Sequence, residues 1–185
     1  MKRYILASGS PRRRELIKKL NYNFEIIPSK YEEELDTKNF SYDKIEELAY
    51  NKALDVANET EGLAIIVGAD TVVVFNNNIL TKPTDKEDAF NTLNLLSGQE
   101  HLVVTGIAVI NKYSNENIIK SVTTTVAFNK LSAEQINYYI ENFKPFDKAG
   151  SYGIQELPEG FVNYIKGSEE NVIGLCTEAL NEMLK

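Results

Sequence analysis

The chain has 185 residues, 43% of them hydrophobic and 25% charged, which is typical of a globular protein and excludes a disordered or fibrous one. Its 27 acidic and 20 basic side chains give a net charge of −7, which argues against a nucleic-acid-binding surface. No apolar run approaches the roughly 20 residues of a transmembrane helix, because Gly68 and Asp70 interrupt the longest one. The length predicts a single domain over residues 1–185, with no membrane or nucleic-acid partner.

The first six residues, Met-Lys-Arg-Tyr-Ile-Leu, lead directly into polar sequence and lack the apolar core of a secretory signal. We therefore expect a cytoplasmic protein. Cys176 is the single cysteine and cannot form an intramolecular disulfide, and His101 is the single histidine. One thiol and one imidazole do not make a zinc site, so we interpret both residues as structural.

Apolar patterning in the first half of the chain predicts alternating strands and helices. In chain order these are a strand at 4–7, a helix at 12–20, a strand at 24–27, an acidic loop at 31–36, a long helix beginning at 41, and strands at 63–67, 71–75 and 79–80. Ser10 is expected to cap the first helix, with Pro11 in its first turn. Asn76-Asn77-Asn78 is typical of a hairpin turn.

The second half of the chain continues this alternation. It predicts a helix between 84 and 98, strands at 101–110 and 118–128, a helix from 132 to about 143, a Gly-rich loop at 148–156, a strand at 161–165 and a terminal helix from about 177. Thr84 with Glu87, and Ser132 with Gln135, match the capping-box pattern. Interleaved helices and strands together with hairpins favour an α/β fold with a mixed twisted sheet flanked by helices.

The segment Leu6-Ala-Ser-Gly-Ser-Pro-Arg-Arg-Arg14 places Arg12 and Arg13 in the first turn of a helix, where the macrodipole is already positive. Each unpaired arginine there should cost about 0.3–1 kcal/mol, so its removal would stabilise the empty protein. A strand, a small-residue turn and a helix N-terminus can bind phosphate, and arginine offers phosphate a two-pronged fork. The alternative is that Glu15 or the acidic loop neutralises the arginines.

Three charged residues further along the chain interrupt apolar patterns. Lys52 falls in the helix stripe that should face the core, so its ammonium either snorkels at the edge or reaches a polar cavity. Asp70 lies in a run suited to a buried strand, where a carboxylate needs a cation, a metal or a catalytic role, unless Gly68 makes a bulge or turn. The hairpin would return Lys82 toward Asp70, where a plain salt bridge is the alternative to a functional pair.

A carboxylate of the acidic loop, Glu33, could join Asp70 on a magnesium ion, which prefers hard oxygen ligands and substrate phosphates. The alternative is that the loop is only a solvated acidic surface. The sequence has no Walker loop and no nucleophilic Ser–His or Cys–His pair. Phosphate-binding cations with two carboxylates suit metal-assisted attack of water on a polyphosphate; the cations are Arg12, Arg13, Lys52 and Lys82.

Several collinear segments resemble the Maf nucleotide pyrophosphatases, a family named for septum formation inhibition. They are Leu-Ala-Ser-Gly-Ser-Pro-Arg-Arg at 6–13, Asn-Lys-Ala at 51–53, Gly-Ala-Asp-Thr-Val-Val at 68–73, Lys-Pro at 82–83, Leu-Ser-Gly-Gln-Glu-His at 96–101, Val-Thr-Gly at 104–106, Asp-Lys-Ala-Gly-Ser-Tyr-Gly-Ile-Gln at 147–155, Gly-Ser at 167–168 and Asn-Val-Ile-Gly-Leu at 171–175. Segments in one order over nearly the whole chain are far more specific than any one of them. The chain is identified as a member of this family.

The resemblance implies an ITPase-like fold with a cleft between two lobes, and a cytoplasmic, commonly homodimeric enzyme that uses a divalent cation such as Mg, Mn or Co. It implies hydrolysis of nucleoside triphosphates to the monophosphate and pyrophosphate, with Asp70 as the proton acceptor. The other implied residues are Lys52 and Lys82 in catalysis, Ser8, Arg12 and Arg13 at the phosphates, and Glu33 with Asp70 at the metal.

Arg12, Thr71 and Gln155 match the branch of the family that is similar to dTTP/UTP pyrophosphatases, in contrast to the branch acting on 7-methyl-GTP. The amide of Gln155 carries a donor and an acceptor, so it can pair with the uracil or thymine edge. Glu156 departs from the family pattern, in which Gly is common, and Cys176 stands where Pro is usual. The competing hypothesis is a non-catalytic nucleotide-binding regulator of cell division, which would need no base at Asp70.

Overall fold

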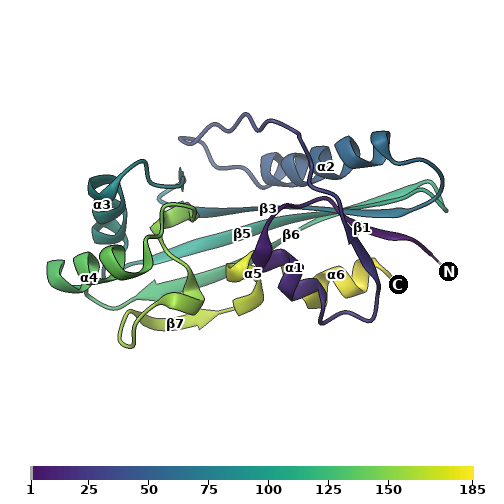
Figure 1. The fold of residues 1–185 in the computed structure, drawn as a ribbon. Coiled ribbons are helices and arrows are strands. Elements are labelled where there is room, and N and C mark those ends of the chain that lie inside the picture. The colour runs from purple at the N-terminus through teal and green to yellow at the C-terminus, as the bar shows by residue number, and fades with distance from the viewer. Residues whose placement is uncertain (1) are drawn as a thin grey trace.

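Seven strands form one mixed sheet in the computed structural model, which describes residues 2–185 (Figure 1). They are β1 (Tyr4–Leu6), β2 (Phe24–Ile26), β3 (Ile65–Phe75), β4 (Asn78–Leu80), β5 (Glu100–Asn111), β6 (Glu116–Phe128) and β7 (Val162–Lys166). The strand order is β2-β1-β3-β5-β6-β7, and β4 pairs with β3. β1 runs parallel to β2 and β3, whereas every other pair is antiparallel. The predicted mixed sheet is confirmed.

Helices cover both faces of the sheet and one end of it. They are α1 (Pro11–Ile17), α2 (Tyr42–Glu59), α3 (Lys86–Leu96), α4 (Ala133–Phe143), α5 (Glu169–Ile173) and α6 (Thr177–Met183), with short 3-10 turns η1 (Ala149–Ser151) and η2 (Ile154–Glu156). Figure 1 shows α2 on one face, α1 and α6 on the other, and α3 beside α4 at one end. Across residues 2–185, none of the helices has the length and apolar content needed to span a bilayer.

Strand β3 runs through the centre of the molecule, and its buried side chains alternate between the two faces. Ile65 and Val67 pack with α1 and α6, whereas Ile66 packs with α2. On one edge β3 pairs continuously with β5. On its other edge it pairs with β1 only over 65–67 and with β4 only over 73–75, so residues 68–72 lie between these two neighbours.

Glycine allows α2 to lie directly on the sheet. A Cβ at Gly68 would clash with the Ala49 carbonyl oxygen and stand 2.7 Å from the Ala53 nitrogen, and one at Gly106 would stand 2.5 Å from the Ile45 carbonyl oxygen. The strand continues through Gly68 in regular pairing, so the alternative of a bulge or turn there is wrong, and the two predicted strands are one. Close helix packing explains this glycine.

Most capping predictions are confirmed, and one is wrong. Ser10 accepts a hydrogen bond from the Arg13 nitrogen, and the Ser132–Gln135 capping box is present. Helix α3, however, is capped by Asp85, whose carboxylate accepts from the Asp88 nitrogen at 2.8 Å. The same spacing therefore occurs one residue later than predicted from Thr84 and Glu87, because a carboxylate is a strong acceptor for helix N–H groups. The short helix α5 was not predicted.

Candidate active site

A cavity of about 450 Å³ lies beside residues 70–73 of β3, and its size is within the range of small-molecule sites. Helix α1, helix α2, the acidic loop, the segment after β4 and the loop 147–156 all contribute to its wall. Eight of the nine predicted site residues line it: Arg12, Arg13, Glu33, Lys52, Asp70, Thr71, Lys82 and Gln155. Ser8 does not line the cavity, but its hydroxyl accepts from Arg13 Nη1 at 3.4 Å.

Lys52 joins the two carboxylates that were predicted to act together. Its Nζ lies 2.5 Å from Asp70 Oδ1 and also forms an ion pair with Glu33. The side chains of Lys52 and Asp70 are only 14% and 9% exposed, because α2 rests on β3 at Gly68. Of the two interpretations of Lys52, the polar cavity is therefore confirmed. A pair so screened from water interacts more strongly than one on the surface.

The carboxylates of Asp70 and Glu33 face a common point, which is the Lys52 ammonium. Among residues 2–185 there is no group of three or more His, Cys, Asp or Glu that could hold a metal ion. Mg²⁺ is commonly bound by one or two carboxylates together with waters and substrate phosphates. Asp70 and Glu33 therefore fit a cation that is shared with a bound polyphosphate, and do not form a complete metal site by themselves.

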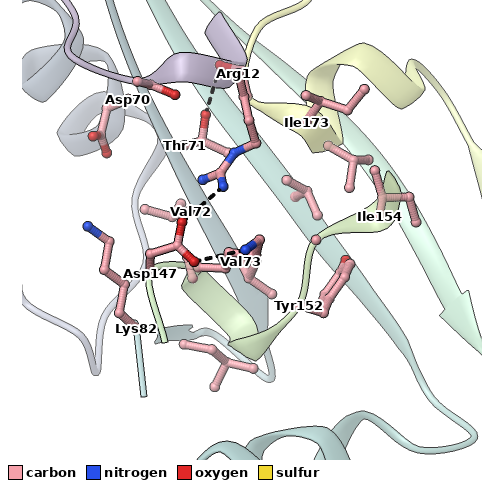
Figure 2. Close-up of a pocket in the computed structure, with 18 of the residues that line it drawn as sticks. Arg12, Asp70, Thr71, Val72, Val73, Lys82, Asp147, Tyr152, Ile154 and Ile173 are labelled. Carbon is pink, nitrogen blue, oxygen red and sulfur yellow. Dashed lines mark hydrogen bonds and ion pairs between the residues drawn. The ribbon is translucent and has the colours of Figure 1, made fainter. Parts of the chain in front are cut away.

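Lys82 lies on the same side of the cavity as Asp70 (Figure 2). Figure 2 shows its ammonium pointing toward the Asp70 carboxylate from the segment after β4. In the part of the chain that the structure describes, no ion pair joins the two residues, because Asp70 pairs with Lys52 instead. The predicted alternative, a plain salt bridge between Lys82 and Asp70, is therefore wrong. The exposed Lys82 side chain can reach a ligand in the cavity.

Arg13 is held by neutral oxygen atoms. Its Nε donates to the Gly174 carbonyl at 2.8 Å, and its Nη2 donates to Thr71 Oγ1 at 2.9 Å. Burial lowers the pKa of the Arg13 guanidinium, while the charge of Asp70 opposes that shift. Because its hydrogen-bond partners carry no charge, the guanidinium keeps a positive charge that a phosphate can neutralise.

Arg12 is paired with a residue that the sequence did not single out for it. Its Nη1 lies 3.3 Å from Asp147 Oδ2 (Figure 2). Burial raises the pKa of Asp147, but a hydrogen bond from Lys148 and the charges of Lys148 and Arg12 bring it below its usual range. The predicted alternative, neutralisation by Glu15 or the acidic loop, is wrong for Arg12. Glu15 pairs with Lys18 on the surface of α1.

The cavity also has an apolar end that sequence analysis missed. Figure 2 shows Tyr152, Ile154 and Ile173 on the side opposite Asp70 and Lys82. These residues belong to a loop and to the end of a short helix, where no hydrophobic period reveals which side chains share a face. The arrangement can hold a molecule with an anionic end and a flat apolar end.

His101 and Cys176 are structural, as predicted. His101 is 2% exposed, and its Nε2 lies 2.7 Å from the hydroxyl of Tyr152 in the cavity wall. Burial lowers the pKa of His101 to about 4, so the ring is neutral at pH 7. Cys176 is buried in the cluster formed by α1, α6 and the central strands.

The chain is similar to known proteins over nearly its whole length. A family model described as "Maf-like protein" matches residues 3–185. The chain is 47% identical over 185 residues to a dTTP/UTP pyrophosphatase of Alkaliphilus oremlandii (strain OhILAs), covering 100% of this chain and 96% of that relative. It is 43% identical over 182 residues to a dTTP/UTP pyrophosphatase of Clostridium beijerinckii, covering 98% and 97%.

Solved structures share the fold at much lower identity. A HAM1 protein from Coxiella burnetii matches with a TM-score of 0.55 and 15% identity, covering 100% of this chain and 98% of that one. The Ham1 protein of Staphylococcus aureus matches with a TM-score of 0.51 and 13% identity, covering 99% and 98%. These similarities confirm the predicted fold.

Proposed function

The chain belongs to the Maf family, and from this premise we propose that it hydrolyses dTTP and UTP to the monophosphate and pyrophosphate. The observation that carries the proposal is the buried Asp70–Lys52 pair, which opens onto the same cavity as the cations of α1 and Lys82. A buried carboxylate that faces an anion-binding cavity is a group suited to accept a proton from water.

The charged end of the cavity would hold the triphosphate. Arg12, Arg13 and Lys82 bring positive charge from two sides, so negative charge that develops on the phosphates during attack is stabilised in place. Asp70 orients the attacking water and takes its proton, and the ion pair with Lys52 holds the Asp70 side chain in position beforehand. A divalent cation held by Asp70, Glu33 and phosphate oxygens would neutralise part of the substrate charge and polarise the phosphoryl group.

The apolar end would hold the nucleoside. Tyr152, Ile154 and Ile173 offer a surface for a base and sugar, and the exposed amide of Gln155 lies in the same wall. Thr71 contributes differently, because its hydroxyl already accepts from Arg13 at 2.9 Å. Its effect on substrate choice would therefore be exerted through the position of Arg13. The homodimer and the cytoplasmic location stay predictions.

Product analysis on a nucleotide panel tests the proposal. The protein is incubated with dTTP, UTP, CTP and GTP in the presence of Mg²⁺, Mn²⁺ or Co²⁺, and the products are separated. We expect pyrophosphate and monophosphate from dTTP and UTP. Orthophosphate as the first product, or full activity in excess chelator, would contradict the proposed reaction. Binding without turnover would favour the nucleotide-binding regulator.

A further inference from the structure

Lys148 has no role in the function proposed above, although it lines the same cavity. It lies in the connection between α4 and η1 and is nevertheless only 8% exposed. Its Nζ lies 2.8 Å from Asp147 Oδ1 and 3.3 Å from Glu156 Oε2. A buried ammonium is tolerated only where such partners compensate for the lost water. One ammonium group therefore pairs with carboxylates at both ends of the loop 147–156.

Gly153 lets the loop cross the Lys148 side chain. A Cβ at this position would stand 2.8 Å from Lys148 Cε, which is closer than real Cβ contacts, and 3.0 Å from Lys148 Cδ, which is tighter than most of them. The Gly153 nitrogen also donates to the hydroxyl of Tyr139 in α4 at 3.0 Å. The backbone of the loop thus packs directly on the stem of Lys148, whose ammonium pairs with carboxylates at both ends of the loop.

Each carboxylate that contacts Lys148 is connected to a different part of the cavity. Asp147 uses its other oxygen, Oδ2, to bind Arg12 at 3.3 Å. Glu156 directly follows Gln155 in the turn η2. One ammonium therefore fixes Arg12, which belongs to the charged end, relative to Gln155, which lies near the apolar end.

We propose that Lys148 is a positioning residue for base selection, because it sets the distance between Arg12 and Gln155. The inference rests on the proposed function, since it assumes that a nucleotide extends from one of these residues to the other. A base contact can select a base only when the phosphate clamp holds the nucleotide so that its base reaches that contact. A hydrogen bond to the base weakens steeply once its geometry is lost. Lys148 acts through its neighbours and does not contact the reacting phosphate.

Removing the charge of Lys148 should affect binding more than turnover. In Lys148→Met the carboxylates of Asp147 and Glu156 lose their common partner, and Arg12 remains as a partner of Asp147 only. We expect KM for UTP to rise, kcat for UTP to change less than about twofold, and the UTP-to-CTP ratio of kcat/KM to fall about tenfold. A merely structural role would lower activity on both nucleotides by one factor and leave the ratio unchanged.

The matched control is Lys120→Met. Lys120 is an exposed lysine of β6 whose Nζ lies 3.5 Å from Glu182 Oε2, outside the cavity. This variant should keep the wild-type ratio. Glu156→Gln provides a second test, because it removes the charge of a half-exposed residue and is tolerated more easily than a buried change. It should lower the ratio in the same direction as Lys148→Met.

The double variant separates a shared role from two independent ones. If Lys148 and Glu156 act as one unit, the ratio in the double variant equals that in Lys148→Met and is not the product of the two effects. An unchanged ratio in Lys148→Met, multiplicative effects, or a wild-type ratio near one would overturn the proposal. Should Lys148→Met fail to fold, the ratio in Glu156→Gln decides in the same way.

Failure of the proposed function gives a different result. In that case wild type releases no pyrophosphate from UTP, and the same variants are compared by calorimetric titration with UTP and CTP in excess chelator. The expected result is then an approximately tenfold loss in the ratio of the two dissociation constants in Lys148→Met. An unchanged ratio of dissociation constants overturns the positioning role independently of catalysis.

Discussion

The two ends of the cavity are built from different kinds of structure. At the charged end, Asp70 lies within the long strand β3 and Lys52 within the long helix α2, and Gly68 keeps these two elements in contact. At the other end, the loop 147–156 has only short 3-10 turns and is held by single side chains, among them Lys148. The proposed chemistry thus lies on regular elements, and the proposed recognition lies on a loop whose shape depends on a few buried contacts.

Asp70→Asn tests the charged end and has the largest expected effect. The amide keeps the shape of the side chain but accepts no proton, so kcat should fall about 10²- to 10⁴-fold while nucleotide binding persists. Turnover assays and calorimetric binding measure the two quantities separately. Glu182→Gln removes an exposed carboxylate outside the cavity and should leave kcat unchanged. Normal turnover in Asp70→Asn would mean that Asp70 is structural.

Gly68→Ala tests whether direct helix contact positions the charged end. The added Cβ meets the backbone of Ala49 and Ala53, so α2 must shift, and we expect a loss of about 1–3 kcal/mol in the free energy of unfolding. Chemical denaturation measures this loss. Gly9→Ala is the matched control, since its Cβ would meet only Pro28 at 3.7 Å. Equal stability of the two variants would rule out the packing explanation.

His101→Gln tests the loop end through the pH dependence of stability. The pKa of His101 is lowered from 6.5 to about 4 by burial, so folding favours the neutral ring. The free energy of unfolding that this pKa shift contributes is fully present above pH 6.5 and is lost as the pH falls toward 4. At pH 5 the loss is about 2 kcal/mol. Free energies of unfolding at pH 7 and pH 5 should therefore differ less in His101→Gln than in wild type. Equal differences would show that His101 does not contribute.

Arg13→Ala has the smallest expected effect, and its sign is opposite to the one expected from the sequence. An unpaired arginine at the N-terminus of α1 would destabilise the empty protein. Arg13 instead donates to Gly174 and Thr71, so its removal takes one donor from each of these oxygen atoms and should lower the free energy of unfolding by about 1 kcal/mol. Arg14→Ala, on the exposed side of α1, serves as the comparison. A higher melting temperature for Arg13→Ala would restore the original expectation.

The charged end could be predicted because its residues violate a regular pattern. Lys52 interrupts the apolar stripe of a helix and Asp70 interrupts a buried strand, so each is conspicuous where the period is clear. The closeness of the two residues could not be predicted, because it depends on the contact between α2 and β3 at Gly68. A bulge or turn at the same glycine stayed open as an alternative, because its tertiary neighbours are distant in the sequence.

The loop end could be predicted only in part. Gln155 was predicted because the sequence resembles a known family. The pairing of Arg12 with Asp147 was not predicted, since the two residues are 135 positions apart. In a loop without a period, nothing in the sequence indicates that Lys148 is buried or that Gly153 crosses its stem. The helix α5 was missed for a related reason, since five residues are too few to establish a helical period.

The interrupted edge of β3 has a consequence for association with other chains. An unpaired strand edge invites a foreign strand to add to the sheet, which leads to aggregation. Here β1 and β4 occupy the edge on either side of residues 68–72, so the open part is bounded at both of its ends. An incoming strand could therefore pair with β3 only over these five residues, since β1 and β4 already use the positions on either side. The open part of the edge therefore borders the cavity beside Asp70 and offers a foreign strand only a short length for pairing.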